Sequence, residues 1–303
     1  MAGRLMPMVA WRQSNLWIVR SAEAMETPSF CPIRTPSALI SSHVRELFNG
    51  NDAFRALFHG IPSPALVEMA GHAGFDLLIV DNEHGSADLQ TTEHQLRAAR
   101  SVGLPAVVRC LEQDIARVLD MGAMGVQIPM VRDAEHARQL VDRVHYPLPK
   151  CESGIGGSRG SAFSTRAAGY GAMGGDPHTR RSHAGVCLIA MLETPEAVEH
   201  ASAIASVPGV DAVFVGPNDL SHCMGHGANW RHPEVQQLIK QAIMAVVAQG
   251  VCAGTLALTT EDESRYHSWG ARFFANVSTA LITQAFARSA QAHRAPADGE
   301  LRY

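Results

Sequence analysis

Short apolar runs alternate with helical stretches along the chain from residue 42 onward. Each run is too short for a helix and is bounded by polar or turn-forming residues, which is typical of a strand buried on both faces. Such strands belong to parallel sheets that helices cover on the outside. The predicted strands are residues 53–59, 76–81, 105–109, 124–129, 186–192, 211–215, 251–256 and 272–276.

The stretches between these runs carry helix signals. Ser63 and Pro64 supply an N-cap and a first-turn proline. Residues 133–144 and 232–249 have apolar residues at helical spacing, and His232 is followed by the proline and glutamate that often begin a helix. Eight strands that alternate with helices predict an α/β fold of the (β/α)8 TIM-barrel type.

The composition narrows the class of partner. The net charge is −4 and the basic residues form no stripe, which argues against nucleic acid as a partner. No apolar run reaches the roughly 20 residues that a membrane helix needs. The six cysteines form no C-x-x-C pair, and several fall inside predicted strands, which indicates reduced thiols in an intracellular protein. We therefore expect a cytoplasmic protein with small-molecule partners.

Residues 1–41 differ from the rest of the chain. They are rich in Arg, Ser and Pro, contain only Glu23 and Glu26 as acids, and show no helical or strand period. We expect a poorly ordered extension, or an over-long start with Met25 as the native first residue. An organelle transit peptide stays open because the stretch is Arg-rich and acid-poor, whereas a secretory signal would need an apolar core. The barrel domain is therefore assigned to residues 42–303.

Residues 146–184 form an unusually long connection between the fourth and fifth strands. The segment contains eight glycines. Long glycine-rich loops in compact domains are more often binding loops than linkers. We expect this segment to act as a lid or a binding loop.

Chemical groups follow four of the predicted strands at the point where each strand ends. In a closed barrel of parallel strands these ends meet around one pocket, where catalytic residues gather. This convergence predicts an enzyme. The residues are Asp81 to His84 after the second strand, Arg109 after the third, Glu193 after the fifth and Asp219 after the sixth.

Glu193 and Asp219 are candidate metal ligands. Hard divalent cations such as Mg²⁺ take oxygen ligands, often one or two carboxylates with substrate and water, and Mn²⁺ or Co²⁺ would also suit. Either residue alone could instead cap the helix that follows its strand. Their matched placement on neighbouring strands favours the metal.

Asp81 and His84 are a candidate catalytic dyad, because a nearby carboxylate makes a histidine more basic. Arg109 is a candidate for binding a substrate carboxylate, or else for pairing with a barrel acid such as Glu83. For Glu83 a structural salt bridge and a role in the pocket both stay open. His222, Cys223 and His226 have a spacing compatible with zinc, but no second ligand pair accompanies them.

Taken together, several motifs resemble the metal-dependent (class II) pyruvate aldolases of the citrate lyase superfamily, typified by 2,4-dihydroxyhept-2-ene-1,7-dioate aldolase. The resemblance covers residues 44–290. Its motifs, in order, are Asp81-Asn82-Glu83-His84-Gly85, Val107-Val108-Arg109, Arg159-Gly160, Arg166-Ala167-Ala168-Gly169-Tyr170-Gly171, Leu192-Glu193-Thr194 and Val215-Gly216-Pro217-Asn218-Asp219-Leu220-Ser221.

The resemblance implies a barrel of the phosphoenolpyruvate/pyruvate-binding type, assembled as a hexamer with an exchanged terminal helix. It implies that Glu193 and Asp219 hold the metal, that His84 acts as the base directly or through water, and that Arg109 stabilises the transition state. Asp81 and Asp120 match acidic positions that support the histidine. The substrate-binding positions are Gly216, Pro217, Asn218 and Asp219, together with Met191.

The chain departs from the family pattern at three places. Met191 stands where the best-known aldolases have a substrate-binding glutamine, which leaves the substrate open. The segment after Arg109 is about three residues shorter, by comparison with the family pattern. Asn276-Val277-Ser278 stands where the family usually has a glycine and an aspartate, which leaves the subunit contacts open.

The resulting hypothesis is a lyase that cleaves a 4-hydroxy-2-oxo acid to pyruvate and an aldehyde. A Schiff-base aldolase needs a lysine in the pocket, and neither Lys150 nor Lys240 lies on a predicted strand. Two alternatives remain. One is a citrate-synthase-like relative that forms a carbon–carbon bond, and the other is a non-catalytic protein that binds oxo-acids.

Overall fold

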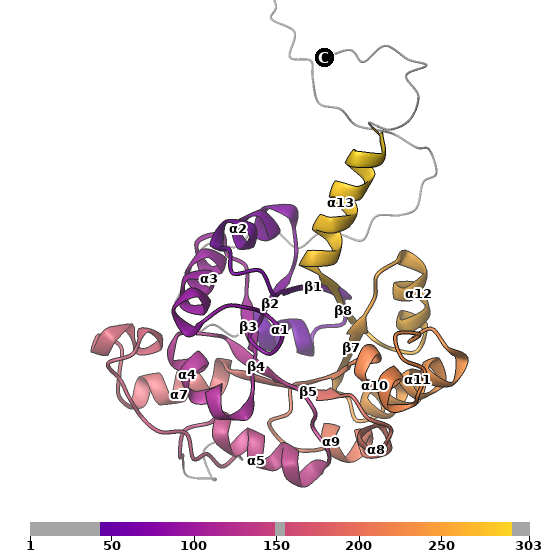
Figure 1. The fold of residues 1–303 in the computed structure, drawn as a ribbon. Coiled ribbons are helices and arrows are strands. Elements are labelled where there is room, and N and C mark those ends of the chain that lie inside the picture. The colour runs from indigo at the N-terminus through magenta and orange to yellow at the C-terminus, as the bar shows by residue number, and fades with distance from the viewer. Residues whose placement is uncertain (1–42, 149–154, 293–303) are drawn as a thin grey trace, which may run out of the picture. The chain divides into compact units, whose positions relative to one another are not determined.

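Eight parallel strands close into a barrel in sequence order, β1 to β8, with β8 paired to β1 (Figure 1). The computed structural model describes residues 43–148 and 155–292. All eight predicted strands are confirmed to within one residue at each end. Their bounds are β1 Phe54–His59, β2 Leu77–Asp81, β3 Ala106–Arg109, β4 Gly125–Ile128, β5 Cys187–Leu192, β6 Ala212–Val215, β7 Cys252–Leu256 and β8 Phe273–Val277.

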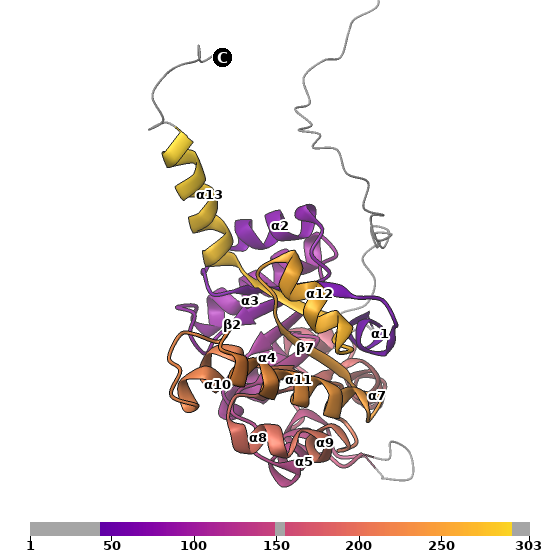
Figure 2. The ribbon, with the colours of Figure 1, turned by 90° about the vertical axis from the view of Figure 1, so that its right-hand side faces the viewer.

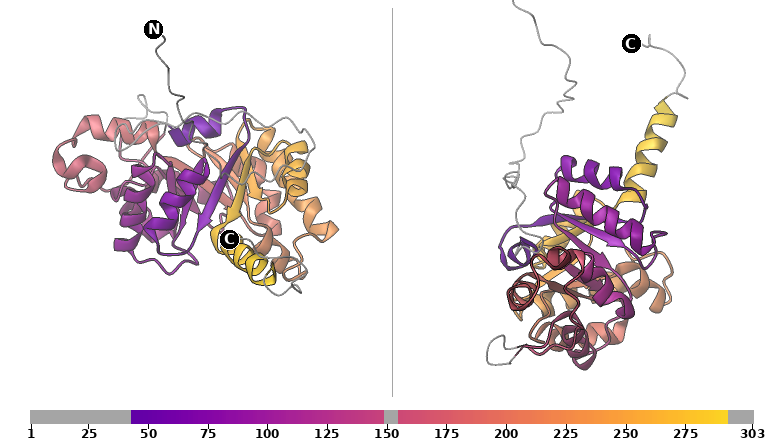
Figure 3. Two further views of the ribbon diagram at one scale, coloured as in Figure 1. Left: turned by 90° about the horizontal axis from the view of Figure 1, so that it is seen from above. Right: turned by 90° about the vertical axis from the view of Figure 1, so that its left-hand side faces the viewer.

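Helices surround this barrel (Figures 1 and 3). The three predicted helix starts are confirmed: the side chains of Ser63, Asp133 and His232 accept hydrogen bonds from backbone N–H groups of the first turn. The helices are α1 His43–Asn49, α2 Pro64–Ala73, α3 Leu89–Ser101, α4 Ile115–Asp120, α5 Ala134–Val144, α7 Asp176–Gly185, α8 Pro195–Glu199, α9 Ala201–Ala205, α10 Pro217–Cys223, α11 Pro233–Val247, α12 Thr260–Ser268 and α13 Ser278–Ala292, with 3₁₀ turns η1 Glu112–Asp114 and η2 Arg166–Gly171.

The core has two parts, one between the barrel and its helices and one inside the barrel. Inside, the rings of Phe54 and Phe273 stack with centroids 5.0 Å apart, and Phe48 of α1 packs against both. Phe54 and Phe273 begin their strands, so α1 closes the amino end of the barrel. The interior is therefore filled at that end and can open only at the carboxyl ends of the strands.

The connection that we predicted to be a lid lies at the amino end instead. Arg45 of α1 donates to the backbone carbonyls of His183, Ala184 and Val186 at the end of this segment, at 2.8 to 3.1 Å. The reason is topological: the segment leaves α5 and enters β5 at its amino end. The prediction of a lid is therefore wrong for the described part of the segment, and residues 149–154 lie outside the description.

The last described helix, α13, extends away from the barrel (Figure 2). Its side chains Leu281 and Phe286 are 38% and 70% exposed. Within residues 43–148 and 155–292, no helix combines the length and apolar character needed to cross a membrane. The predicted extension at residues 1–41 lies outside the described residues and stays a prediction.

Candidate active site

A cavity of about 590 Å³ opens at the carboxyl ends of the strands. Of the residues predicted to be catalytic, substrate-binding or metal-binding from the family resemblance, it brings together all except Asp120. The remaining lining is largely apolar and comes from other strand ends and from the segment after α10. The lining residues are Phe58, Gly60, Asp81, His84, Arg109, Met191, Glu193, Phe214, Gly216, Pro217, Asn218, Asp219, His222, Ala228, Leu256, Val277 and Thr279.

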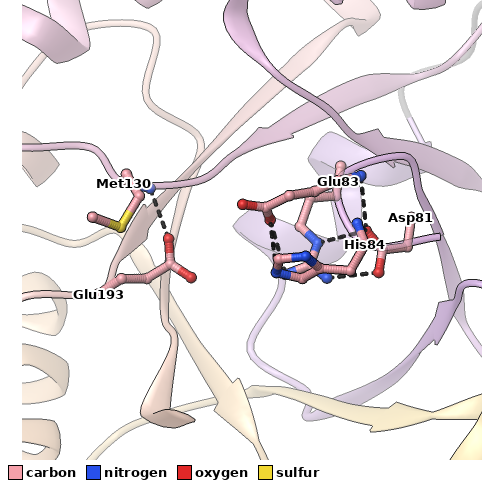
Figure 4. A network of polar contacts seen from close by, with 6 residues as sticks. Asp81, Glu83, His84, Met130 and Glu193 are labelled. Atoms are coloured by element: carbon pink, nitrogen blue, oxygen red, sulfur yellow. Dashed lines mark hydrogen bonds and ion pairs between the residues drawn. The ribbon is translucent and has the colours of Figure 1, made fainter. Parts of the chain in front are cut away.

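Glu193 follows β5 and is 2% exposed. Its Oε2 accepts a hydrogen bond of 2.7 Å from the backbone N–H of Met130 (Figure 4). Met130 has a left-handed backbone with φ of 55°, which is uncommon for a residue other than glycine. Burial raises the pKa of Glu193 to about 7, and the nearby negative charge of Asp219 adds to the effect. Two carboxylates near each other in one pocket are a donor set that a divalent cation would stabilise.

Gly216 leaves the space that Glu193 occupies. A Cβ at this position would lie 2.7 Å from Cγ and 2.8 Å from Oε1 of Glu193. Gly216 also precedes α10, whose first turn carries Asp219. The absence of a side chain at Gly216 therefore allows the Glu193 carboxylate to lie beside the start of α10, which carries Asp219. A side chain at this position would displace the Glu193 carboxylate.

We expect Gly216→Ala to weaken binding of a divalent cation by roughly 10- to 100-fold, the usual cost of losing a group that orients a metal ligand. Gly60→Ala is the matched control, because a Cβ at Gly60 would meet Asp81 Oδ2 only at 3.8 Å, in ordinary contact. Titration with Mn²⁺ measures both affinities. Equal affinities in the two variants would show that Gly216 has no such role.

Arg109 and Asp81 form a two-point ion pair on neighbouring strands. Arg109 Nε donates to Oδ1 at 2.9 Å and Nη2 to Oδ2 at 2.6 Å, while Nη1 lies 3.2 Å from Glu83 Oε2. Burial opposes the charge of Asp81, but the hydrogen bonds and charge of Arg109 outweigh it and hold the pKa of Asp81 below its usual range. The two hydrogen bonds to Asp81 use two of the five N–H groups of the guanidinium, and Nη1 pairs with Glu83 by charge, so donors remain for a ligand.

The carboxylate nearest the His84 ring in the structure differs from the one predicted. The backbone N–H of His84 donates to Asp81 Oδ1 at 3.3 Å, whereas its ring Nε2 lies 3.8 Å from Glu83 Oε2 (Figure 4). The Asp81 carboxylate is already engaged by Arg109. The predicted Asp81–His84 dyad is therefore wrong as a contact between side chains: Asp81 fixes the loop, and Glu83 is the carboxylate that faces the imidazole.

Asp120 does not reach the cavity of its own chain. It ends α4, which leads into β4 at the amino end of the barrel, and its Oδ1 accepts a 2.6 Å hydrogen bond from the buried Arg159. The support of His84 by Asp120 is therefore not made within one chain. The position of Asp120 could not be predicted from sequence spacing, because spacing does not show at which end of the barrel a helix terminus lies.

Three groups were not predicted from the sequence to belong to the cavity. The backbone N–H of Met130 that holds Glu193 carries no side-chain signal. His222 lies one turn after Asp219 on α10 and lines the same cavity. Phe58 and Leu256 supply apolar walls, and both lie at strand ends, so the rule that located the charged residues could have located them too.

Metal-free protein is expected to become more stable above pH 7 on Glu193→Gln substitution. The pKa of Glu193 rises from 4.5 to about 7 on folding, so the folded state binds this proton more tightly than the unfolded chain. That contribution is complete below pH 4.5 and is lost as the pH rises through about 7. Glutamine avoids the loss, which amounts to about 3 kcal/mol.

Urea unfolding with a chelator at pH 5 and at pH 8 measures this difference. The variant should gain stability over wild type at pH 8 and little at pH 5. If variant and wild type differed in stability by the same amount at pH 5 and at pH 8, burial would not raise the pKa of Glu193.

A (β/α)8 barrel with carboxylates, a histidine and an arginine around one cavity at its strand ends has the architecture of a barrel enzyme. The chain is a member of the HpcH/HpaI aldolase/citrate lyase family, which matches residues 55–283. It is 38% identical over 233 residues to the hydroxypyruvate/pyruvate aldolase of Delftia acidovorans, a match that covers 76% of this chain and 84% of that protein.

Other relatives agree. The 2-keto-3-deoxy-L-rhamnonate aldolase of Salmonella gallinarum is 36% identical over 253 residues, which cover 82% of this chain and 92% of the relative. A HpcH/HpaI aldolase/citrate lyase family protein from Burkholderia cenocepacia superposes with a TM-score of 0.78 at 29% identity, covering 84% of this chain and 100% of its own. Citrate synthase SbnG gives a TM-score of 0.72 at 26% identity, with coverages of 86% and 100%.

Proposed function

We propose that this enzyme cleaves a 4-hydroxy-2-oxo acid to pyruvate and an aldehyde, reversibly, with a divalent cation. The observation that carries the proposal is the meeting of Glu193, Asp219, His84 and Arg109 in one cavity at the strand ends. Membership of an aldolase family and the names of the two aldolase relatives support it.

Glu193 and Asp219 would hold the cation. Their donors are hard oxygens, which suit Mg²⁺, Mn²⁺ or Co²⁺. The raised pKa of Glu193 and the room left by Gly216 both fit a ligand that needs a positive partner. When bound, the cation would supply Lewis acidity toward the keto and carboxylate oxygens of the substrate.

The side chains of the chain supply the remaining chemistry. His84 is 65% exposed at the side chain and opens on the cavity, so its ring can accept the proton of the 4-hydroxyl, directly or through water, as the C3–C4 bond breaks. The electron pair of that bond remains on C3 as the enolate of pyruvate. Arg109 would stabilise the developing negative charge with its remaining donors. A proton on C3 completes pyruvate.

The lysines do not offer the other aldolase chemistry in the described part of the chain. Lys240 lies on α11, with its Nζ 6.0 Å from the ring centre of Trp269, and it does not line the cavity. Lys150 lies outside the described residues. An imine mechanism would need a lysine at the reacting carbon.

A citrate-synthase-like condensation is the second candidate. The similarity to citrate synthase SbnG favours it. A pyruvate assay coupled to lactate dehydrogenase separates the two, with 4-hydroxy-2-oxo acids as substrates and Mg²⁺, Mn²⁺ or Co²⁺ present. Pyruvate release supports the aldolase, and its absence across the panel would contradict the aldolase and leave the condensing enzyme or a non-catalytic oxo-acid-binding protein.

Met191 should determine substrate choice more than chemistry. It lies two residues before Glu193 on β5 and lines the cavity with it. A glutamine here could donate a hydrogen bond to substrate, whereas methionine offers an adaptable apolar surface. We expect Met191→Gln to change the order of preferred aldehydes and to keep the metal requirement. Met191→Leu is the control, and an unchanged order in the glutamine variant would make Met191 a packing residue.

We further infer a homo-oligomer that works in the cytoplasm, with a hexamer as the assembly the family resemblance implies. The exposed Phe286 and Leu281 on α13 support association, because apolar side chains of this size favour burial against a partner. Sedimentation analysis tests the assembly.

A further inference from the structure

A second cluster of metal-binding side chains lies in the segment that joins α10 to α11 and in the first turn of α11. A ring nitrogen from each of His226 and His232 and a carboxylate oxygen of Glu234 lie within 4.8 Å of one another. It is the one such group of three among the described residues, so the zinc grouping of His222, Cys223 and His226 considered from the sequence is not formed.

The geometry of this cluster is already close to that of a metal site. His226 Nε2 is 2.9 Å from Glu234 Oε2, and the two imidazole rings stack with centroids 3.7 Å apart. Tetrahedral zinc ligands lie about 3.4 Å from one another, so modest side-chain rotations suffice. His232 Nδ1 accepts from the backbone N–H of Glu234, which fixes the ring and leaves Nε2 for another partner.

The backbone holds these residues in place without a metal. His226 N donates to Ser221 O at 2.9 Å, and His232 N donates to Asn229 O at 2.9 Å. Gly225 and Gly227, on either side of His226, have φ of 80° and 56°, which allows the tight turn. A cation would therefore find two imidazoles already positioned, with little conformational entropy left to lose.

We propose that His226, His232 and Glu234 bind a zinc-class divalent cation, separately from the carboxylates of the cavity. Two imidazole nitrogens with one carboxylate oxygen are a ligand set that suits Zn²⁺, whereas Mg²⁺ prefers oxygen ligands alone. Three protein ligands leave a fourth position for water.

Such a cation would stiffen one wall of the cavity. His222 and Ala228, which line the cavity, lie on either side of His226 in the sequence. The stretch from α10 to α11 therefore contributes to both sites, and zinc bound to His226 would restrain that wall.

The test uses the full chain with Glu193→Gln and Asp219→Asn, so that the cavity carboxylates contribute little to zinc binding. We expect this protein to bind one equivalent of Zn²⁺ in calorimetry. Adding His226→Ala or His232→Asn should weaken that binding at least about tenfold. Asparagine keeps the helix cap, so the second variant removes the ligand and leaves the start of α11 intact. His200→Ala, at the end of α8, is the control and should bind as before.

Histidine ¹⁵N NMR identifies the ligands directly. The ring nitrogens of His226 and His232 should shift on zinc addition, while those of His200 should not. Zinc binding that survives both histidine variants, or shifts confined to other histidines, would overturn the site. Neither result depends on aldolase activity, so the site and the proposed function are tested independently.

Discussion

Glu193→Gln and Asp219→Asn are each expected to reduce pyruvate release to the background rate. Each substitution removes a charged oxygen donor from the pair of carboxylates that we propose to hold the cation, and amides bind hard cations more weakly. Glutamine keeps the shape of Glu193 and can still accept the Met130 N–H, so the backbone contact survives. The loss of activity would then report on the cation and not on the fold.

The stability of the Glu193→Gln protein is the control for correct folding. It should equal or exceed that of metal-free wild type at pH 8, because a buried carboxylate with a pKa of about 7 has been removed. Mn²⁺ titration should show weakened binding in both variants. A folded variant that keeps wild-type turnover would contradict the assignment of its residue as a ligand.

His84→Ala is expected to lower turnover by roughly two to four powers of ten, the usual range for losing a general base. The physical reason is that, in the proposed mechanism, the imidazole on the cavity wall takes the hydroxyl proton. The backbone N–H of His84 still reaches Asp81 Oδ1 in the variant, so the loop and the Arg109 pair should stay in place.

Single-turnover and steady-state rates on the same oxo-acid measure this loss. Mn²⁺ affinity should change far less than turnover, because His84 is not one of the two proposed metal ligands. His72→Ala, in the last turn of α2 and outside the cavity, is the control. A His84→Ala enzyme that works at the wild-type rate would make His84 a bystander.

The barrel and most of its site could be predicted because the signals are local. A buried parallel strand is a short apolar run, and the residue that follows it must lie at one end of the barrel. This placed Glu193, Asp219 and Arg109 together without any tertiary information. The two-residue period of a strand also placed Met191 on the same side as Glu193.

The errors arose where partners are set by tertiary geometry. Asp81 and Glu83 are two residues apart in the sequence. The sequence alone does not show which of the two carboxylates accepts the hydrogen bonds of Arg109 and which one faces the His84 ring. Asp120 was assigned to support the histidine from the family resemblance, and the sequence does not show that the end of α4 lies at the amino end of the barrel. The glycines of residues 146–184 suggested a lid, but a connection from a helix into a strand lies at the amino end.

The measurement that tests the central claim most directly is metal removal and return on the wild-type enzyme. Pyruvate release from a 4-hydroxy-2-oxo acid is followed in metal-loaded protein, in protein stripped with excess chelator, and in stripped protein given Mg²⁺, Mn²⁺ or Co²⁺, with borohydride added in a parallel reaction. We predict activity that vanishes on stripping, returns with the cation and leaves no covalent adduct. Full activity in excess chelator, or an imine trapped by borohydride, would contradict the account.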